Sequence, residues 1–266
     1  MSDYSPLQPG RFRSTAALYA RFRLGYPASL IDRVIAATGL KAGDPVLDLG
    51  AGPGPLALGF AAAGMTVTAV DPEPEMLEAL ENIAKSAQLT VRALAGSSGQ
   101  MPPGIGPFRL VTIGRAFHWM DRTETAKDLD RLVLPGGALA LFEEVTLKTV
   151  ENCWRQTLDT VAARYGAASA PHRQERADPT HRAHESVLLG SPFCRLETIG
   201  EIVHRTLSVD DIVGFAGSLS VTSRAALGER ADAFEAELRA ALTALDGRFE
   251  QIAEMRVLLA RRGSPQ

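Results

Sequence analysis

The chain has 266 residues, of which 45% are hydrophobic and 22% are charged. These proportions are average for soluble globular proteins and exclude disordered, collagenous and coiled-coil classes. The formal net charge is −3, whereas dedicated nucleic-acid-binding proteins usually have a basic surplus. The sequence has 2 cysteines, too few for a disulfide framework, so we expect a cytoplasmic protein.

Neither a targeting segment nor a membrane span is visible in the sequence. Residues 1–13 are polar, and the longest apolar runs, 56–63 and 138–142, are too short to cross a bilayer. We therefore expect a protein that binds neither membranes nor nucleic acid. The expected oligomeric state is a monomer or a homodimer.

In the first 150 residues, strand-like and helix-like patterns alternate. Short apolar or β-branched runs predict strands, and apolar residues at helical spacing predict helices between them. In chain order, the expected elements are strand 45–49, helix 56–63, strand 66–70, helix 73–87, strand 89–94, strand 110–113, helix 122–132 and strand 138–142. This alternation predicts a parallel sheet with helices on both faces.

The second half of the chain has a different pattern. One helical face over residues 150–165 collects Val150, Trp154, Leu158, Val161 and Tyr165. Residues 164–186 are polar and predict a loop or an irregular insertion. They are followed by a predicted strand over 196–203, a helix N-cap at Ser208, an amphipathic helix over 231–245 with Leu245 on its apolar stripe, and a last strand over 249–259.

A glycine-rich loop follows the first predicted strand. Gly50 and Gly52 allow the backbone to turn sharply and to approach a ligand closely. Asp48 lies near the end of this strand, and Asp71 ends the next one. A carboxylate at the position of Asp71 can accept hydrogen bonds from both hydroxyls of a ribose. Ligands of doubly wound sheets bind at this carboxyl edge.

Three interpretations of the loop are open. It could be a tight turn without a ligand, although the acid on the following strand argues against this. It could bind a dinucleotide, but Pro53 and Pro55 remove N–H groups that a pyrophosphate needs, and Asp48 would repel phosphates. A ligand that carries an ammonium group and a ribose, but no phosphate, fits these charges better.

Several segments carry recognisable motifs in a consistent order. They are residues 18–27 with a Tyr, Arg and Tyr-Pro pattern, 46–54 with the glycines, 67–77 with Asp71, 110–121 with the His118-Trp119 pair, and 134–138 with Pro-Gly-Gly. Together they resemble class I S-adenosylmethionine-dependent methyltransferases, in particular the small-molecule branch that includes trans-aconitate-type enzymes. The resemblance covers residues 15–145. It implies S-adenosyl-L-methionine as the cofactor.

The resemblance also implies a fold and a set of cofactor-binding residues. The implied fold is α/β, a Rossmann-like seven-stranded methyltransferase sheet that is mostly parallel, with an antiparallel last strand and a helical insertion near the C-terminus. The implied cofactor-binding residues are Tyr19, Arg23, Asp48, Gly50, Ala51, Gly52, Asp71, Pro72, Met76, Ser97, Ser98 and Arg115. Where the family's third-strand motif usually carries an acidic residue, Ser97 offers the adenine amino group a weaker acceptor.

His118 is the candidate catalytic residue. It follows the fourth predicted strand and therefore belongs to the same edge as Gly50 and Asp71. A hydroxyl or amine acceptor needs a base, whereas a carboxylate acceptor needs none. His118 also reads as a packing or cofactor-lining histidine beside Trp119, which itself could be a core aromatic or could cover the adenine or the substrate.

Two other groups of polar residues have alternative interpretations. Tyr19, Arg23 and Tyr26 either form a lid over the methionine half of the cofactor or lie on a surface helix. The segment with His172, His181, His184 and Glu185 has some spacing typical of a metal site, but the arginines around it would oppose a cation, so we expect no metal. Those arginines, like Arg23, could instead attract an anionic substrate.

These observations predict a single methyltransferase domain over residues 1–266. Its parts are N-terminal lid helices over 1–35, a cofactor-binding half over 36–145, substrate-pocket helices and an insertion with one strand over 146–247, and a closing strand and tail over 248–266. The expected activity is methyl transfer to a small molecule, at a carboxylate or hydroxyl oxygen. The alternatives are an NAD(P)-dependent oxidoreductase on a Rossmann fold and a non-catalytic S-adenosylmethionine-binding module.

Overall fold

The computed structural model describes residues 16–167, 182–245 and 248–263. In these residues one seven-stranded sheet has the order β3-β2-β1-β4-β5-β7-β6. The strands are β1 (Pro45–Leu49), β2 (Thr66–Asp71), β3 (Val91–Ala95), β4 (Phe108–Gly114), β5 (Val133–Thr146), β6 (Arg195–Leu207) and β7 (Phe249–Arg261). Strands β1 to β5 pair in parallel, and β7 pairs antiparallel with β5 and β6. The predicted sheet with an antiparallel last strand is therefore confirmed.

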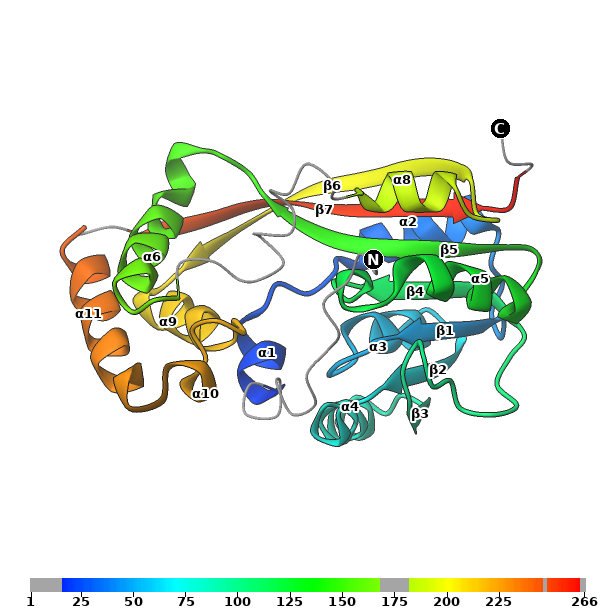
Figure 1. The fold of residues 1–266 in the computed structure, drawn as a ribbon, viewed down its shortest axis with the longest axis horizontal. Helices are drawn as coiled ribbons and strands as arrows, with labels where there is room; N and C mark the ends of the chain where they lie inside the picture. Colours follow the sequence, from blue (N-terminus) through cyan, green and yellow to red (C-terminus); the bar gives the residue numbers. More distant parts are fainter. Residues whose placement is uncertain (1–15, 168–181, 246–247, 264–266) are drawn as a thin grey trace.

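Helices cover both faces of the sheet (Figure 1). On one face, α2 (Ala28–Thr38), α3 (Pro55–Ala62) and α4 (Pro74–Ser86) share a core with alternate strand residues such as Val46. On the other face, α5 (Arg122–Leu132) and α8 (His184–Leu189) share a core with the strand residues that point to that face, such as Leu47. Successive strand residues thus belong to opposite cores, as the alternation of side chains along a strand requires.

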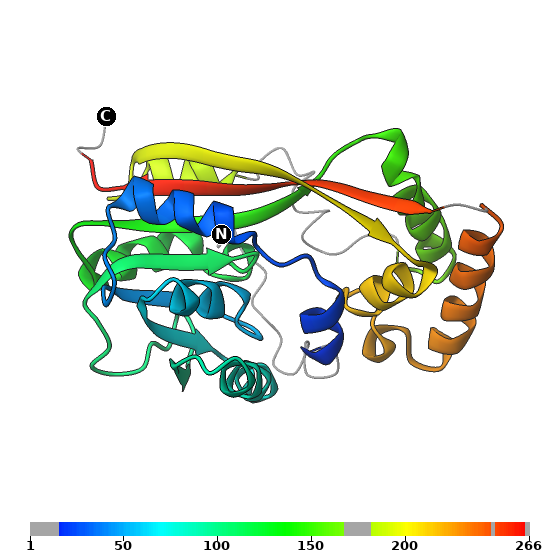
Figure 2. The same ribbon diagram turned by 180° about the vertical axis from the view of Figure 1, so that it is seen from behind.

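The long strands β5, β6 and β7 run beyond this sheet core and carry a second lobe (Figures 1 and 2). The lobe contains α6 (Cys153–Arg164), α9 (Val209–Gly217), α10 (Arg224–Leu227) and α11 (Ala231–Thr243), which pack around Trp154, Phe215 and Leu238. Helix α1 (Ala16–Phe22) lies between the lobes and contacts both α4 and α9. The predicted cap of α9 is present, since Ser208 Oγ accepts a hydrogen bond from the Asp211 amide at 3.1 Å.

The structure corrects several predicted boundaries. The helix predicted over 150–165 begins at Cys153, because residues 150–152 form a 3-10 turn that leaves the Val150 side chain 84% exposed. Leu245 lies beyond the end of α11 and is 49% exposed. In the loop predicted over 164–186, His184 already begins α8, and residues 168–181 lie outside the described part. Strand β5 is longer than predicted because its end continues towards the second lobe, paired with β7.

The two described N-terminal helices occupy different places. Leu30, Ile31 and Val34 of α2 are buried in the core over the sheet, so α2 is part of the sheet's helical layer. Of the described residues before β1, α1 and the residues next to it therefore remain the candidates for a lid over the cofactor. None of the helices in the described part of the chain combines the length and the apolar character that crossing a membrane requires.

Candidate functional site

Hydrogen bonds fasten the glycine loop between β1 and α3 to the end of β2. The amides of Gly50 and Ala51 donate to the Val70 carbonyl at 2.8 and 3.1 Å, and the amide of Gly52 donates to Asp71 Oδ2 at 2.8 Å. Gly50 and Gly52 have φ values of 71° and 55°, a region that strongly favours glycine. The loop is therefore the tight turn that the sequence predicts, with a fixed position over β2.

The two glycines leave room for different neighbours. A Cβ atom on Gly50 would lie 2.7 Å from the Ala116 Cβ atom, so this glycine allows the loop to pack against the chain after β4. A Cβ atom on Gly52 would meet no protein atom within 4 Å, and Gly52 lines a pocket. The close approach of a ligand that the sequence suggests for both glycines therefore fits Gly52 best.

This pocket opens at the carboxyl ends of β1, β2 and β4. It is lined by most of the predicted cofactor-binding residues: Tyr19, Gly50, Gly52, Asp71, Pro72, Met76, Ser97, Ser98 and Arg115. Sequence reasoning gave no cofactor role to Glu73 or Met120, which also line it, and left Trp119 open. Glu73 follows the predicted acid, Asp71, by two residues. Its position directly after β2 could therefore have indicated that it lines the pocket.

Asp71 is a carboxylate of the pocket wall, with 7% of the residue exposed. Its Oδ1 accepts a hydrogen bond from the Glu73 amide at 2.9 Å, while Oδ2 accepts from Gly52. Burial raises the pKa of Asp71, and these two hydrogen bonds oppose the rise. Since each carboxylate oxygen has two lone pairs, Asp71 retains acceptor capacity for ligand hydroxyls.

Asp48 and Ala51, which the resemblance places in the cofactor site, do not line this pocket. Asp48 Oδ2 accepts from the Ala57 amide at 3.0 Å, and Oδ1 accepts from Thr112 Oγ1 at 3.0 Å. The carboxyl thus joins β1 to the first turn of α3 and to β4, and burial raises its pKa to about 7. Ala51 is buried, and its amide already donates to the Val70 carbonyl in β2.

Arg23, the third predicted residue outside the pocket wall, turns towards the second lobe. Its Nε donates to Ser218 Oγ of the second lobe at 3.0 Å, and its guanidinium carbon lies 5.0 Å from the centre of the Phe215 ring. The same carbon lies 5.1 Å from the ring centre of Tyr19, which does line the pocket. Arg23 therefore contacts Tyr19, a residue of the pocket wall, but does not line the pocket itself.

A larger cavity of about 1330 Å³ adjoins this pocket. Arg115 and Ala116 line both spaces, so the two meet after the end of β4. Other lining residues come from the end of β5, from α6 and α8, and from β7: they include Glu143, Glu144, Thr146, Lys148, Arg155, Asp159, His184 and Arg256. Glu143 and Glu144 were missed by sequence reasoning, although they directly follow the predicted fifth strand and thus share its carboxyl edge.

His118 and Trp119 belong to one 3-10 turn, Phe117–Trp119, but face different spaces. His118 lines the larger cavity, and Trp119 lines the smaller pocket, with 4.7 Å between the ring centres. The structure thus brings His118 to the predicted edge, on the side of the larger cavity. Trp119 contributes an aromatic ring to the wall of the smaller pocket.

Arg115 separates the two spaces and has a positive φ of 53°. Its Nη1 donates to Glu144 Oε2 at 2.9 Å, and its Nη2 donates to the Leu24 carbonyl at 3.1 Å. Burial alone would lower the pKa of Arg115, but Tyr19, Tyr26 and Glu144 outweigh it and raise the pKa. The boundary between the two spaces therefore carries an ion pair, Arg115 with Glu144.

His184, from the histidine-containing segment in which the sequence analysis expects no metal, is engaged with other side chains. Its Nδ1 lies 3.3 Å from Arg122 Nη1, and its Nε2 lies 3.5 Å from Glu143 Oε1. Because a guanidinium only donates, Nδ1 accepts and Nε2 carries the hydrogen towards Glu143. His172 and His181 lie outside the described residues. Within the residues that are described, no group of three or more His, Cys, Asp or Glu is arranged to hold a metal ion.

Comparisons with known proteins agree with this geometry. Residues 46–137 match the methyltransferase-domain family. An uncharacterised methyltransferase of Mycobacterium tuberculosis is 35% identical over 130 residues, which are 49% of this chain and 50% of that protein. An uncharacterised methyltransferase-like protein of Schizosaccharomyces pombe is 28% identical over 196 residues, 72% of this chain and 74% of that one.

Among solved structures, a SAM-dependent methyltransferase from Thiobacillus denitrificans, in complex with S-adenosyl-L-homocysteine, has a similar fold. It is 17% identical, with a TM-score of 0.52 over 97% of this chain and 100% of that chain. The chain spans about half the length of the mycobacterial relatives it matches.

Proposed function

We propose that this chain is a class I S-adenosylmethionine-dependent methyltransferase, as the match of residues 46–137 to the methyltransferase-domain family supports, and that it methylates an oxygen atom of a small molecule. The cofactor would occupy the pocket over the glycine loop, and the acceptor would occupy the larger cavity. The observation that supports this division is that the two spaces meet at Arg115 and Ala116. A methyl group can pass between ligands only where their binding sites touch.

The residues of the smaller pocket fit a cofactor without phosphate groups. Gly52 leaves open space above the loop, and Asp71 offers acceptors to a ribose. The helix terminus that a pyrophosphate would need is already used, since the Ala57 amide of α3 donates to Asp48 and Pro55 has no N–H. These features favour S-adenosyl-L-methionine over a nicotinamide dinucleotide.

When bound, the cofactor supplies a methyl carbon that the adjacent sulfonium already activates. The tasks of this chain are to position the acceptor oxygen, to limit access of water and, for a hydroxyl acceptor, to remove a proton. His118 lines the acceptor cavity and is the proposed base for a hydroxyl. For a carboxylate acceptor, positioning alone is sufficient.

A turnover experiment tests this proposal. The purified chain is incubated with S-adenosyl-L-methionine that is radiolabelled on the methyl group and with fractionated small-molecule extracts. We expect labelled products that are absent when the Gly52→Val variant is used. Mild alkali distinguishes the acceptors, because it releases labelled methanol from a methyl ester and leaves a methyl ether intact. Cofactor binding without any labelled product would instead favour a non-catalytic binding module.

A further inference from the structure

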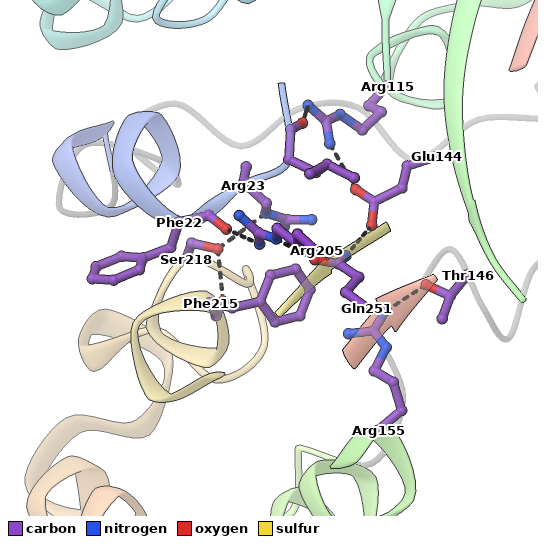
Figure 3. A network of polar contacts seen from close by, with 11 residues as sticks. Phe22, Arg23, Arg115, Glu144, Thr146, Arg155, Arg205, Phe215, Ser218 and Gln251 are labelled. Carbon is purple, nitrogen blue, oxygen red and sulfur yellow. Dashed lines mark hydrogen bonds and ion pairs between the residues drawn. The ribbon is translucent and has the colours of Figure 1, made fainter. Parts of the chain in front are cut away.

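Helix α1 packs directly on α9 of the second lobe. A Cβ atom on Gly214 would overlap the Phe22 ring. A Cβ atom on Gly217 would approach Leu18 Cδ1 to 3.1 Å. The Phe22 carbonyl also accepts a hydrogen bond from Arg205 Nη2 of β6 at 2.9 Å (Figure 3). The two glycines therefore allow a close contact between the helices, and α1 and α9 form one packed unit.

The same helix α1 also reaches the proposed cofactor pocket. Its Tyr19 lines that pocket, and among the described lining residues Tyr19 alone comes from α1. The ring centre of Tyr19 lies 5.5 Å from the guanidinium carbon of Arg115, another lining residue. Helix α1 also contacts α4, which begins after the end of β2. One part of the cofactor-pocket wall thus belongs to a helix that is packed on the second lobe.

Arg23 joins this part of the wall to the end of α9. Its guanidinium carbon lies 5.1 Å from the ring centre of Tyr19 and 5.0 Å from that of Phe215 in α9. Its Nε donates to Oγ of Ser218, the buried residue that directly follows α9, at 3.0 Å (Figure 3). Stacking of a cation on an aromatic ring and a charge-assisted hydrogen bond both depend on orientation. Arg23 can therefore transfer a constraint on Tyr19 to α9.

The Phe215 ring also contacts the helix that lines the larger cavity. The guanidinium carbon of Arg155 in α6 lies 4.8 Å from the centre of this ring, and the Trp154 ring packs edge-on against it at 5.7 Å. Helix α6 contributes Gln156 and Thr160, as well as Arg155, to the wall of the larger cavity. The position of α9 therefore helps to determine where α6 places this wall.

A ligand shifts a conformational equilibrium only as far as it contacts one arrangement better than another. In the cofactor pocket, Tyr19 supplies such a difference, because most of the other lining residues belong to the sheet core and its loops, whereas Tyr19 belongs to the unit of α1 and α9. A ligand that contacts Tyr19 therefore stabilises the arrangement in which this unit lies against the sheet core.

We propose that Arg23 is a positioning residue that couples cofactor binding to the geometry of the acceptor cavity. The bound cofactor contacts Tyr19, and Arg23 transfers this constraint to Phe215 and Ser218. The second lobe is then held in the position that completes the acceptor cavity. Coupling between two sites is reciprocal, so loss of this link also weakens cofactor binding, although Arg23 does not line the pocket. This inference rests on the proposed function.

Hydrogen–deuterium exchange of the full chain, with and without saturating S-adenosyl-L-homocysteine, tests the coupling. The amides of α9 are the readout, because none of the described residues that line the cofactor pocket belongs to α9. The variants are Arg23→Gln, Arg23→Lys and Ser218→Ala. The matched control is Arg224→Gln in α10 of the same lobe, since Arg224 pairs with Asp232 at the surface.

We expect the ligand to slow exchange in α9 about fivefold or more in the wild-type chain and in the control. Arg23→Gln should abolish most of this effect and Ser218→Ala part of it. Arg23→Lys should retain part, because it keeps the positive charge without the planar guanidinium. A merely structural role would raise α9 exchange equally with and without the ligand. An unchanged ligand effect in Arg23→Gln, or none in the wild-type chain, overturns the inference.

Calorimetric titration of the same samples with S-adenosyl-L-homocysteine separates the two proposals. A wild-type chain that does not bind this ligand contradicts the proposed function. A wild-type chain that binds it without any change in α9 contradicts only the coupling. Weaker binding to Arg23→Gln, with the full effect on α9 at saturation, would show that Arg23 contacts the ligand directly and would also overturn the coupling. If Arg23→Gln does not fold, Arg23→Lys and Ser218→Ala decide the test by the same criteria.

Discussion

Asp71 Oδ2 accepts a hydrogen bond from the Gly52 amide at 2.8 Å, so the carboxylate that ends β2 also holds the glycine loop. Both residues line the proposed cofactor pocket. One side chain therefore orders the loop and offers the ligand an acceptor.

Replacing Asp71 with Asn should weaken binding of S-adenosyl-L-methionine by about tenfold or more, because a charge-assisted hydrogen bond contributes about 1.5–3 kcal/mol. The amide nitrogen that replaces one carboxylate oxygen cannot accept from Gly52, Glu73 or a ribose hydroxyl. Calorimetric titration measures the effect. A dissociation constant equal to that of the wild type would show that Asp71 does not contact the cofactor.

Gly52→Ala should remove most of the cofactor affinity while leaving the chain folded, because the added Cβ would project into open pocket space. The positive φ of 55° adds a strain of about 1–2 kcal/mol for a residue other than glycine. Gly43→Ala is the matched control, since Gly43 also has a positive φ, of 86°, and open space around it, but does not line the pocket. Thermal unfolding should change similarly in both variants, and calorimetry should show cofactor loss in Gly52→Ala alone. Equal cofactor affinity in the two variants would contradict this prediction.

The neighbours His118 and Trp119 should have separable effects, because they face different spaces. On a hydroxyl acceptor, His118→Ala should lower turnover about 10²–10⁴-fold, flatten its pH dependence and leave cofactor affinity unchanged. Trp119→Ala should weaken cofactor binding, because it removes an aromatic wall of the pocket. Steady-state kinetics and calorimetry on both variants test this. Full activity of His118→Ala on a hydroxyl substrate removes His118 from the mechanism.

Asp48 should make the free energy of unfolding depend on pH. Burial raises its pKa from 3.8 to about 7, so between these values the folded chain keeps a proton that the unfolded chain releases. The stabilisation is therefore complete at low pH, is lost as pH rises towards 7, and amounts to at most about 4 kcal/mol.

Asp48→Asn should remove this pH dependence, because the Asn amide does not titrate, while its oxygen can still accept from the Ala57 amide. Urea unfolding at about pH 4.5 and about pH 8 measures the difference. The wild-type chain should lose more stability than the variant between the two conditions. Parallel changes in both chains would show that Asp48 titrates normally.

The sheet could be predicted because strands β1, β2 and β4 are almost entirely buried and because the strands of the first half alternate with helices, a pattern typical of parallel sheets. The second lobe was less accessible to prediction. The exposure of Val150 depends on a 3-10 turn, and the length of β5 depends on its pairing with β7, which is over 100 residues distant in sequence. Long-range pairing of this kind leaves no local signal.

The pocket lining could be predicted where the backbone position of a residue determines its place, as for Gly52 and Asp71; their contact with a cofactor stays a prediction. Asp48 was expected at the cofactor but does not line the pocket, because near the end of β1 its carboxylate bonds instead to the first turn of α3. The direction of Arg23 depends on Ser218 and Phe215 of the second lobe, which sequence reasoning could not place.

Calorimetric titration of the wild-type chain with S-adenosyl-L-methionine, and separately with NAD⁺ and NADP⁺, tests the central claim most directly. The geometry of Gly52, Asp71 and Asp48 predicts a dissociation constant of about 1 μM, or about −8 kcal/mol, for S-adenosyl-L-methionine and no binding of either dinucleotide. Binding of a dinucleotide without binding of S-adenosyl-L-methionine would contradict the account.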